Sequence, residues 1–160
     1  MYYYPQTSYQ LQQQYYNEYL NRKNEGTYQK VFTAILNAIQ AEATAIDFYS
    51  RLVKYAPNKK HKEDILHALE DEKIHLKEFT ELYINLTGQQ PKYTINKTKF
   101  NTYKEGLETA YKDELEAYEE YRNAYLLTQN SQVRDVFLRA FTDEIEHATR
   151  FGFLKLYEGA

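Results

Sequence analysis

The chain has 160 residues, of which 20 are basic and 23 are acidic, and it contains no cysteine. This length fits one domain with a single core, and the near balance of charge without a basic cluster argues against a nucleic-acid partner. The lack of cysteine excludes disulfides, thiolate catalysis and iron–sulfur centres, so any metal must be held by oxygen and nitrogen. Neither a signal peptide nor an apolar run of about 18 residues is present, which predicts a cytoplasmic protein without a membrane span.

Residues 1–26 are rich in tyrosine and glutamine, with seven tyrosines and five glutamines. They show no sustained helical or strand periodicity, as is typical of a low-complexity segment. We therefore predict an N-terminal tail over residues 1–26, followed by one domain over residues 27–160.

Turn-forming residues divide the rest of the chain into segments that each carry apolar residues at helical spacing. The breaks lie at Pro57, at Gly88 with Pro91, and at Gln129. The segments are residues 28–55, 59–87, 100–128 and 131–157, and none has an internal proline. This pattern predicts an all-α fold of four helices.

The connection between the second and third helices differs from the other two in length. It comprises 13 residues, from Thr87 to Lys99. Fully extended it would reach about 43 Å, enough to run the length of a helix bundle. The prediction is therefore two helix hairpins joined by a long crossover between helices 2 and 3.

The apolar residues of each predicted helix form a stripe along one face. Each stripe is interrupted by a glutamate, and those of the second and fourth helices also by a histidine. The six residues are Glu42, Glu72, His75, Glu114, Glu144 and His147. A buried carboxylate costs several kcal/mol unless it is paired, hydrogen-bonded or bound to a metal. We therefore predict that each of these glutamates is paired, hydrogen-bonded or bound to a metal within the core.

An internal repeat relates these polar residues in the first half of the chain to those in the second half. Shifting the sequence by 72 residues places Glu42 on Glu114, Tyr49 on Tyr121, Asp71 on Asp143, Glu72 on Glu144 and His75 on His147. The midpoints of the two glutamate pairs are residues 57 and 129, which lie at predicted turns. In antiparallel hairpins the glutamates of each pair would then lie at the same level, about 22 Å from the turn. We predict that all six side chains converge on one point.

Four buried carboxylates would repel one another unless cations neutralised them, and two divalent ions balance four negative charges. Glutamate and neutral histidine together suit iron or manganese, with zinc able to compete. One Glu from each of two helices, with Glu-x-x-His from each of the other two, is the ligand set of ferritin-like di-metal proteins.

The sequence resembles the rubrerythrin and bacterioferritin branch of the ferritin-like superfamily. The shared motifs are EATAIDFY (42–49) with DEKIH (71–75), and ELEAYEEY (114–121) with DEIEH (143–147). The resemblance implies a ferritin-like four-helix bundle with two metal ions, expected to be iron, with manganese or a mixed pair as alternatives. It also implies roles for the six residues: Glu42 and Glu114 as terminal ligands, Glu72 and Glu144 as bridges, and His75 and His147 as ligands of one ion each.

Two departures from the family pattern bear on the reaction. Rubrerythrins usually add a rubredoxin-like domain with a four-cysteine iron, which a cysteine-free chain cannot form. They also carry an extra glutamate where this chain has Ala117. No haem is expected, because Met1 is the only methionine.

The resemblance implies a homodimeric oxidoreductase that reacts with dioxygen or hydrogen peroxide and draws on an unidentified electron donor. Ferroxidase or peroxidase activity is the main expectation, and a manganese catalase-like enzyme is the first alternative. A structural spore-coat-like protein is the second, since similar tyrosine- and glutamine-rich tails occur on bacterial spore coat proteins.

The residues around the predicted ligands give further expectations. Asp71 and Asp143 each precede a bridging glutamate, and one helical step turns a side chain by about 100° toward a neighbouring helix. We predict that Asp71 pairs with His147 and Asp143 with His75, on the nitrogen that faces away from the metal. Tyr49 and Tyr121 are read as core aromatics, with a role beside the ligands or in electron relay as the alternative. The two remaining histidines, 61 and 67, have no counterparts in the repeat and are expected at the surface.

Overall fold

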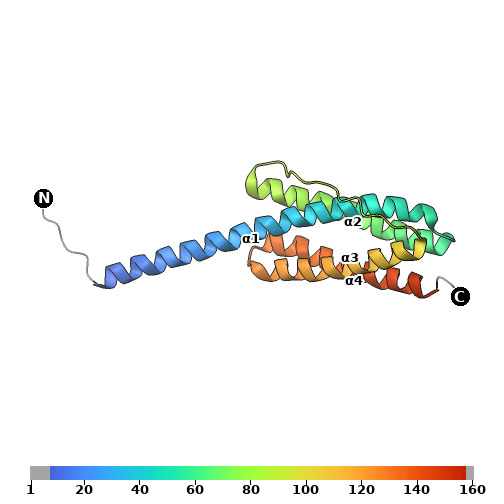
Figure 1. Cartoon of the computed structure of the whole chain (residues 1–160). Helices are drawn as coiled ribbons and strands as arrows, with labels where there is room; N and C mark the ends of the chain where they lie inside the picture. The colour runs from blue at the N-terminus through green and yellow to red at the C-terminus, as the bar shows by residue number, and fades with distance from the viewer. Residues whose placement is uncertain (1–7, 158–160) are drawn as a thin grey trace.

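The computed structural model describes residues 8–157, with side chains from residue 25 onward, and it consists of four long helices (Figure 1). The elements are α1 (Ser8–Leu52), a short 3-10 turn (Val53–Tyr55), α2 (Lys59–Thr87), α3 (Tyr103–Leu127) and α4 (Ser131–Tyr157). No strand occurs within the described residues, so the predicted all-α fold is confirmed. None of these helices is long and apolar enough to cross a membrane.

The helix ends follow from local capping. The Asn58 side chain accepts a hydrogen bond from the backbone N–H of His61 at 3.0 Å and so begins α2. Thr102 caps α3 in the same way, which explains why this helix begins later than the sequence pattern predicted. Gly88 ends α2 with a φ of 69°, a conformation that favours glycine.

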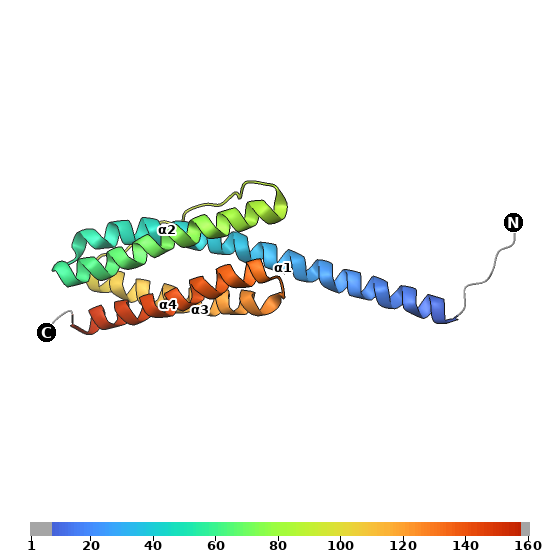
Figure 2. The ribbon, with the colours of Figure 1, turned by 180° about the vertical axis from the view of Figure 1, so that it is seen from behind.

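The first helix is longer than predicted. We expected it to begin near residue 28, but α1 begins at Ser8 and its first part extends beyond the bundle (Figures 1 and 2). Apolar periodicity reports burial against a core, so a helical segment outside the core lacks that signal. Residues 1–7 of the predicted tail lie outside the described residues. The division into tail and domain stays a prediction.

The helices pair as two hairpins, because α1 packs mainly against α2 and α3 packs mainly against α4. The crossover between the hairpins runs along α1, as Figure 1 shows. The backbone N–H of Asn96 donates to Thr44 Oγ1 at 3.2 Å. Arg51 Nη2 donates to the carbonyl oxygen of Thr98 at 2.9 Å. The predicted long crossover is confirmed.

The apolar core consists of two clusters, one toward each end of the bundle. On α2, Ile65 belongs to one cluster and Phe79 to the other, and both are fully buried. Glu72 and His75 lie between these two residues on the same buried face. The core therefore leaves a polar level near the middle of the bundle, shielded from water on both sides.

Candidate metal centre

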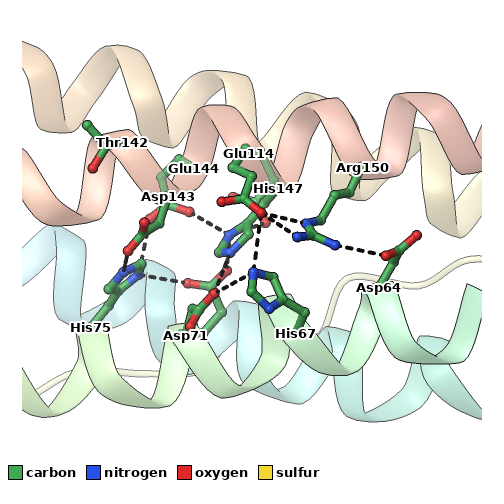
Figure 3. A network of polar contacts seen from close by, with 12 residues as sticks. Asp64, His67, Asp71, His75, Glu114, Thr142, Asp143, Glu144, His147 and Arg150 are labelled. Carbon is green, nitrogen blue, oxygen red and sulfur yellow. Dashed lines mark hydrogen bonds and ion pairs between the residues drawn. The ribbon is translucent and has the colours of Figure 1, made fainter.

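The six predicted ligand residues meet in the middle of the bundle, and each is at most 3% exposed. They come from all four helices: Glu42 from α1, Glu72 and His75 from α2, Glu114 from α3, and Glu144 and His147 from α4. Figure 3 shows His75 reaching from α2 toward α4, and His147 reaching from α4 toward α2. The convergence predicted from the repeat is therefore present in the structure.

The six side chains form two overlapping groups, each able to hold a metal ion. One group is Glu42, Glu72, His75 and Glu144, and the other is Glu72, Glu114, Glu144 and His147. Within each group one atom of every residue lies within 4.8 Å of the others. Because Glu72 and Glu144 occur in both groups, they are in a position to bridge two ions.

The histidines turn the same ring nitrogen, Nδ1, toward the glutamates. His75 Nδ1 lies 3.2 Å from Glu72 Oε2 and 3.4 Å from Glu144 Oε1. His147 Nδ1 lies 3.2 Å from Glu144 Oε2 and 3.3 Å from Glu72 Oε1. The two halves thus have nearly the same geometry, as the 72-residue repeat requires.

Two carboxylate oxygens of this cluster have no hydrogen-bond partner. They are Glu72 Oε1 and Glu144 Oε1, both buried and both on the residues shared by the two groups. They lie 3.3 Å from His147 Nδ1 and 3.4 Å from His75 Nδ1 respectively, without forming a hydrogen bond to it. A buried polar atom without a partner costs about 1–3 kcal/mol, and more when it is charged. Hard cations bind carboxylate oxygen, so the unsatisfied atoms and the Glu/His donor set fit a pair of metal ions.

The pKa values of the glutamates reflect their crowding. Burial raises the pKa of Glu42 well above its ordinary value, and the charge of Glu72 raises it further. Burial, with the charges of Glu114 and Glu42, raises the pKa of Glu144 to about 8. Burial also acts to raise the pKa of Glu114, but its hydrogen bond with His147 contributes to an overall lowering. Divalent cations would remove the repulsion that holds protons on this cluster.

The predicted aspartate–histidine pairs are confirmed. His147 Nε2 lies 3.1 Å from Asp71 Oδ2, and His75 Nε2 lies 3.0 Å from Asp143 Oδ2. Each pair joins α2 to α4, so the aspartate of one hairpin contacts the histidine of the other (Figure 3). An aspartate at Nε2 favours a proton on that nitrogen, and Nδ1, which here contacts the glutamates, is then the nitrogen that could bind a cation.

This arrangement predicts the effect of Asp143→Asn. The amide cannot offer the same charged acceptor to His75 Nε2, so the imidazole loses part of its orientation and basicity. We expect metal affinity to fall roughly 10- to 100-fold, as is typical when a partner of a ligating histidine is changed. Competitive titration with a coloured chelator would measure this change. Asp135→Asn, at an exposed position of α4, is the control and should leave the affinity unchanged.

Two tyrosines connect the hairpins, each through a hydrogen bond to a buried glutamate of the other hairpin. Tyr49 on α1 donates its hydroxyl proton to Glu114 Oε1 at 2.5 Å. Tyr121 on α3 donates to Glu42 Oε1 at 2.6 Å. Burial raises the pKa of both hydroxyls well above the ordinary value, so they remain protonated donors. Both tyrosines are thus buried core residues in contact with the converging glutamates, and a role of theirs at a metal site stays a prediction.

The expected surface position is found for only one of the two other histidines. The expectation of a surface position is wrong for His61, which is 6% exposed and lies with Nδ1 3.0 Å from the Tyr103 hydroxyl. A repeat comparison could not reveal a contact between residues that have no counterparts. His67 is exposed as expected, but its Nε2 lies 3.2 Å from Asp71 Oδ2. The four-residue spacing of His67 and Asp71 on one helix was a signal for this contact.

A cavity of about 390 Å³, which the sequence did not predict, opens beside the cluster. Its walls come from α1, α3 and the crossover, and its lining includes all four buried glutamates. Ala45 and Ala117 also line it, three residues after Glu42 and Glu114 respectively. The two alanines are related by the repeat, and their small side chains leave space next to the glutamates.

Comparison with solved structures supports the fold. The chain is similar to the conserved hypothetical protein rv2844 of Mycobacterium tuberculosis, with a TM-score of 0.72 and 14% identity over 82% of this chain and 94% of that one. It is also similar to part of a two-domain protein with DJ-1-like and ferritin-like domains from Anabaena variabilis. There the TM-score is 0.65 and the identity 12%, over 80% of this chain and 36% of the other. CopM in a silver-bound form matches with a TM-score of 0.72 at 10% identity, over 81% of this chain and 98% of that one.

Sequence comparison places the chain more specifically. It is 36% identical over 116 residues to the uncharacterized protein YhjR of Bacillus subtilis (strain 168), covering 71% of this chain and 79% of that protein. The sequence model of the Rubrerythrin family matches residues 34–155. This range contains all six converging residues and both tyrosines. The chain therefore belongs to the rubrerythrin family.

Proposed function

We propose that this protein is a di-iron oxidoreductase that uses dioxygen or hydrogen peroxide as the oxidant. The observation that carries the proposal is the pair of ligand groups that share Glu72 and Glu144, each with an unsatisfied buried oxygen. The rubrerythrin family binds a di-iron centre, and its members are often oxidoreductases. In this role the bound iron pair supplies electrons to the oxidant.

The residues of the chain have distinct parts in this proposal. Glu72 and Glu144 would hold both ions, while Glu42 and Glu114 would each bind one. The Nδ1 atoms of the histidines complete the donor set, and four carboxylates with neutral imidazoles balance two divalent cations.

The protein also controls protons and water around this site. The tyrosine hydroxyls donate to the terminal glutamates and so limit the directions in which these carboxylates can turn. Asp71 and Asp143 keep the imidazole protons on Nε2. The apolar clusters keep water from the two ends of the site, which strengthens the electrostatic interactions there. The cavity has room for a small oxidant.

Anaerobic loading with Fe(II), followed by oxygen or peroxide, tests this function. We expect two Fe(II) per chain to bind and to be oxidised faster than the same Fe(II) in buffer, with absorption bands of an oxo-bridged ferric pair. Dioxygen release from peroxide only after manganese loading would instead support a catalase-like enzyme. Retention of neither metal would contradict the proposal and favour a structural role for the bundle.

A further inference from the structure

The cavity beside the cluster has a polar mouth that carries negative charge. Asp113, Glu116 and Glu120 line it from α3, at the three- and four-residue spacing that places side chains on one helix face. Gln40 and Asn96 line it from α1 and the crossover. None of the described residues that line the cavity is a lysine or arginine. Its electrostatic potential therefore favours cations and disfavours anions.

The acidic residues of the mouth differ from most other acids of the bundle. Many of those acids are paired, as Glu108 is with Lys112 at 2.8 Å and Glu70 with Lys73 at 2.6 Å. Glu116 and Glu120 are exposed, and they form no ion pair or hydrogen bond with another described residue. Their charges are consequently available to a cation that arrives from solution.

The inner end of the same cavity reaches the two glutamates that both ligand groups share. Glu72 and Glu144 line it, each is 1% exposed, and each has a buried carboxylate oxygen without a hydrogen-bond partner. Ala45 and Ala117 leave space between these buried glutamates and the mouth. The cavity thus connects unpaired carboxylates at the surface with unsatisfied carboxylates in the core.

The opposite side of the cluster, between α2 and α4, carries hydrogen-bonded side chains, and three of them, His67, Asp71 and His147, form a third group that could hold an ion. There Asp71 and Asp143 accept hydrogen bonds from the histidines between α2 and α4, and Arg150 contacts Asp64 (Figure 3). Arg150 also pairs with Glu146. A cation approaching from this side would meet an arginine and would have to break the hydrogen bonds that orient the imidazoles. The α1–α3 side presents neither obstacle.

We propose that the cavity between α1 and α3 is the uptake route for divalent cations, and that Glu116 and Glu120 steer them into it. The inference rests on the proposed di-metal function and adds the path by which the ions arrive. A cleft lined by one sign of charge raises the association rate of an oppositely charged ligand by about 10- to 1,000-fold, and this gain falls steeply with ionic strength. The charge of the mouth should therefore govern the rate of loading and leave the number of bound ions unchanged.

The test uses the full chain and Co²⁺ alone, with stopped-flow absorption to follow binding. For Glu116→Gln with Glu120→Gln, we expect the association rate at low salt to fall roughly 10-fold while the stoichiometry stays the same. The difference should largely disappear at about 0.5 M salt, where charges are screened beyond a few ångströms. Glu119→Gln is the matched control, because this exposed residue of α3 does not line the cavity and should leave the rate unchanged.

The possible results distinguish failure of the proposed uptake route from failure of the proposed metal site. Equal rates for the double variant and the unmodified protein, with normal stoichiometry, would overturn the route but leave the proposed function standing. An equal slowing by Glu119→Gln would also overturn it, because the effect would then reflect overall charge. If the unmodified protein binds no Co²⁺ at equilibrium, both the function and the route are wrong. Circular dichroism of each variant checks that the bundle is intact.

Discussion

Replacing Glu144 with alanine should abolish loading of the metal pair. Glu144 belongs to both ligand groups, so the change removes one oxygen donor from each group and one of the four balancing charges. Unlike a terminal ligand, which serves one ion, a shared ligand affects both. Elemental analysis of the purified variant, after loading and desalting, would measure the effect. Two metal ions per chain in Glu144→Ala would contradict the bridging role.

A second variant at the same position separates metal loss from misfolding. Glu144→Gln keeps the side-chain volume but cannot ionise, so it never carries the charge that Glu114 and Glu42 would repel. The metal-free form of this variant should therefore unfold at a temperature no lower than that of the unmodified protein, while its metal loading is weakened. A lower unfolding temperature together with lost loading would show that Glu144 acts through packing.

Metal removal should destabilise the protein, and more strongly at high pH. An ion that binds only the folded state, present at 100 times its Kd, adds about 2.7 kcal/mol to the free energy of unfolding. For a domain of this size each kcal/mol corresponds to roughly 2–4 °C in unfolding temperature. Thermal unfolding with Fe(II) under anaerobic conditions, compared with chelator-treated protein, would measure the difference.

The direction of the pH effect follows from Glu144. Its pKa is about 8 in the fold against an ordinary 4.5, so the proton is bound more tightly in the folded state. This contribution to stability is fully present below about pH 4.5 and is lost as the pH rises through 8. The metal-free protein should thus lose stability across this window, while a cation that replaces the proton protects the loaded form. An unfolding-temperature difference that shrinks from pH 5 to pH 8 would contradict the charge argument.

The glutamates proposed to bind metal therefore also lower the stability of the metal-free bundle. Four buried glutamates destabilise the metal-free fold, and two apolar clusters offset that cost from either side. Hydrogen bonds reduce this cost further, because the tyrosine hydroxyls bond glutamate oxygens and the aspartates bond the histidine Nε2 atoms. They leave one buried oxygen without a hydrogen bond on each of Glu72 and Glu144, the two residues that both ligand groups share.

The sequence by itself determined the helices of the core, the pairing of the hairpins and the six converging residues. Helical spacing indicated which faces are buried, and the 72-residue repeat put Glu42 level with Glu72, and Glu114 level with Glu144. Even the partners of the histidines followed from the position of each aspartate, because the geometry of a regular helix fixes the direction of adjacent side chains.

Only the tertiary structure decided the features that depend on neighbours without a periodic signal. The start of α1 at Ser8 lies outside the core, where apolar spacing carries no information. The burial of His61 depends on Tyr103, which meets it across two helices and has no fixed sequence distance from it. The cavity exists because Ala45 and Ala117 come to lie on one side of the glutamates beneath the crossover. Small residues in a stripe indicate close packing or open space equally well, and only the three-dimensional arrangement of helices and crossover distinguishes the two.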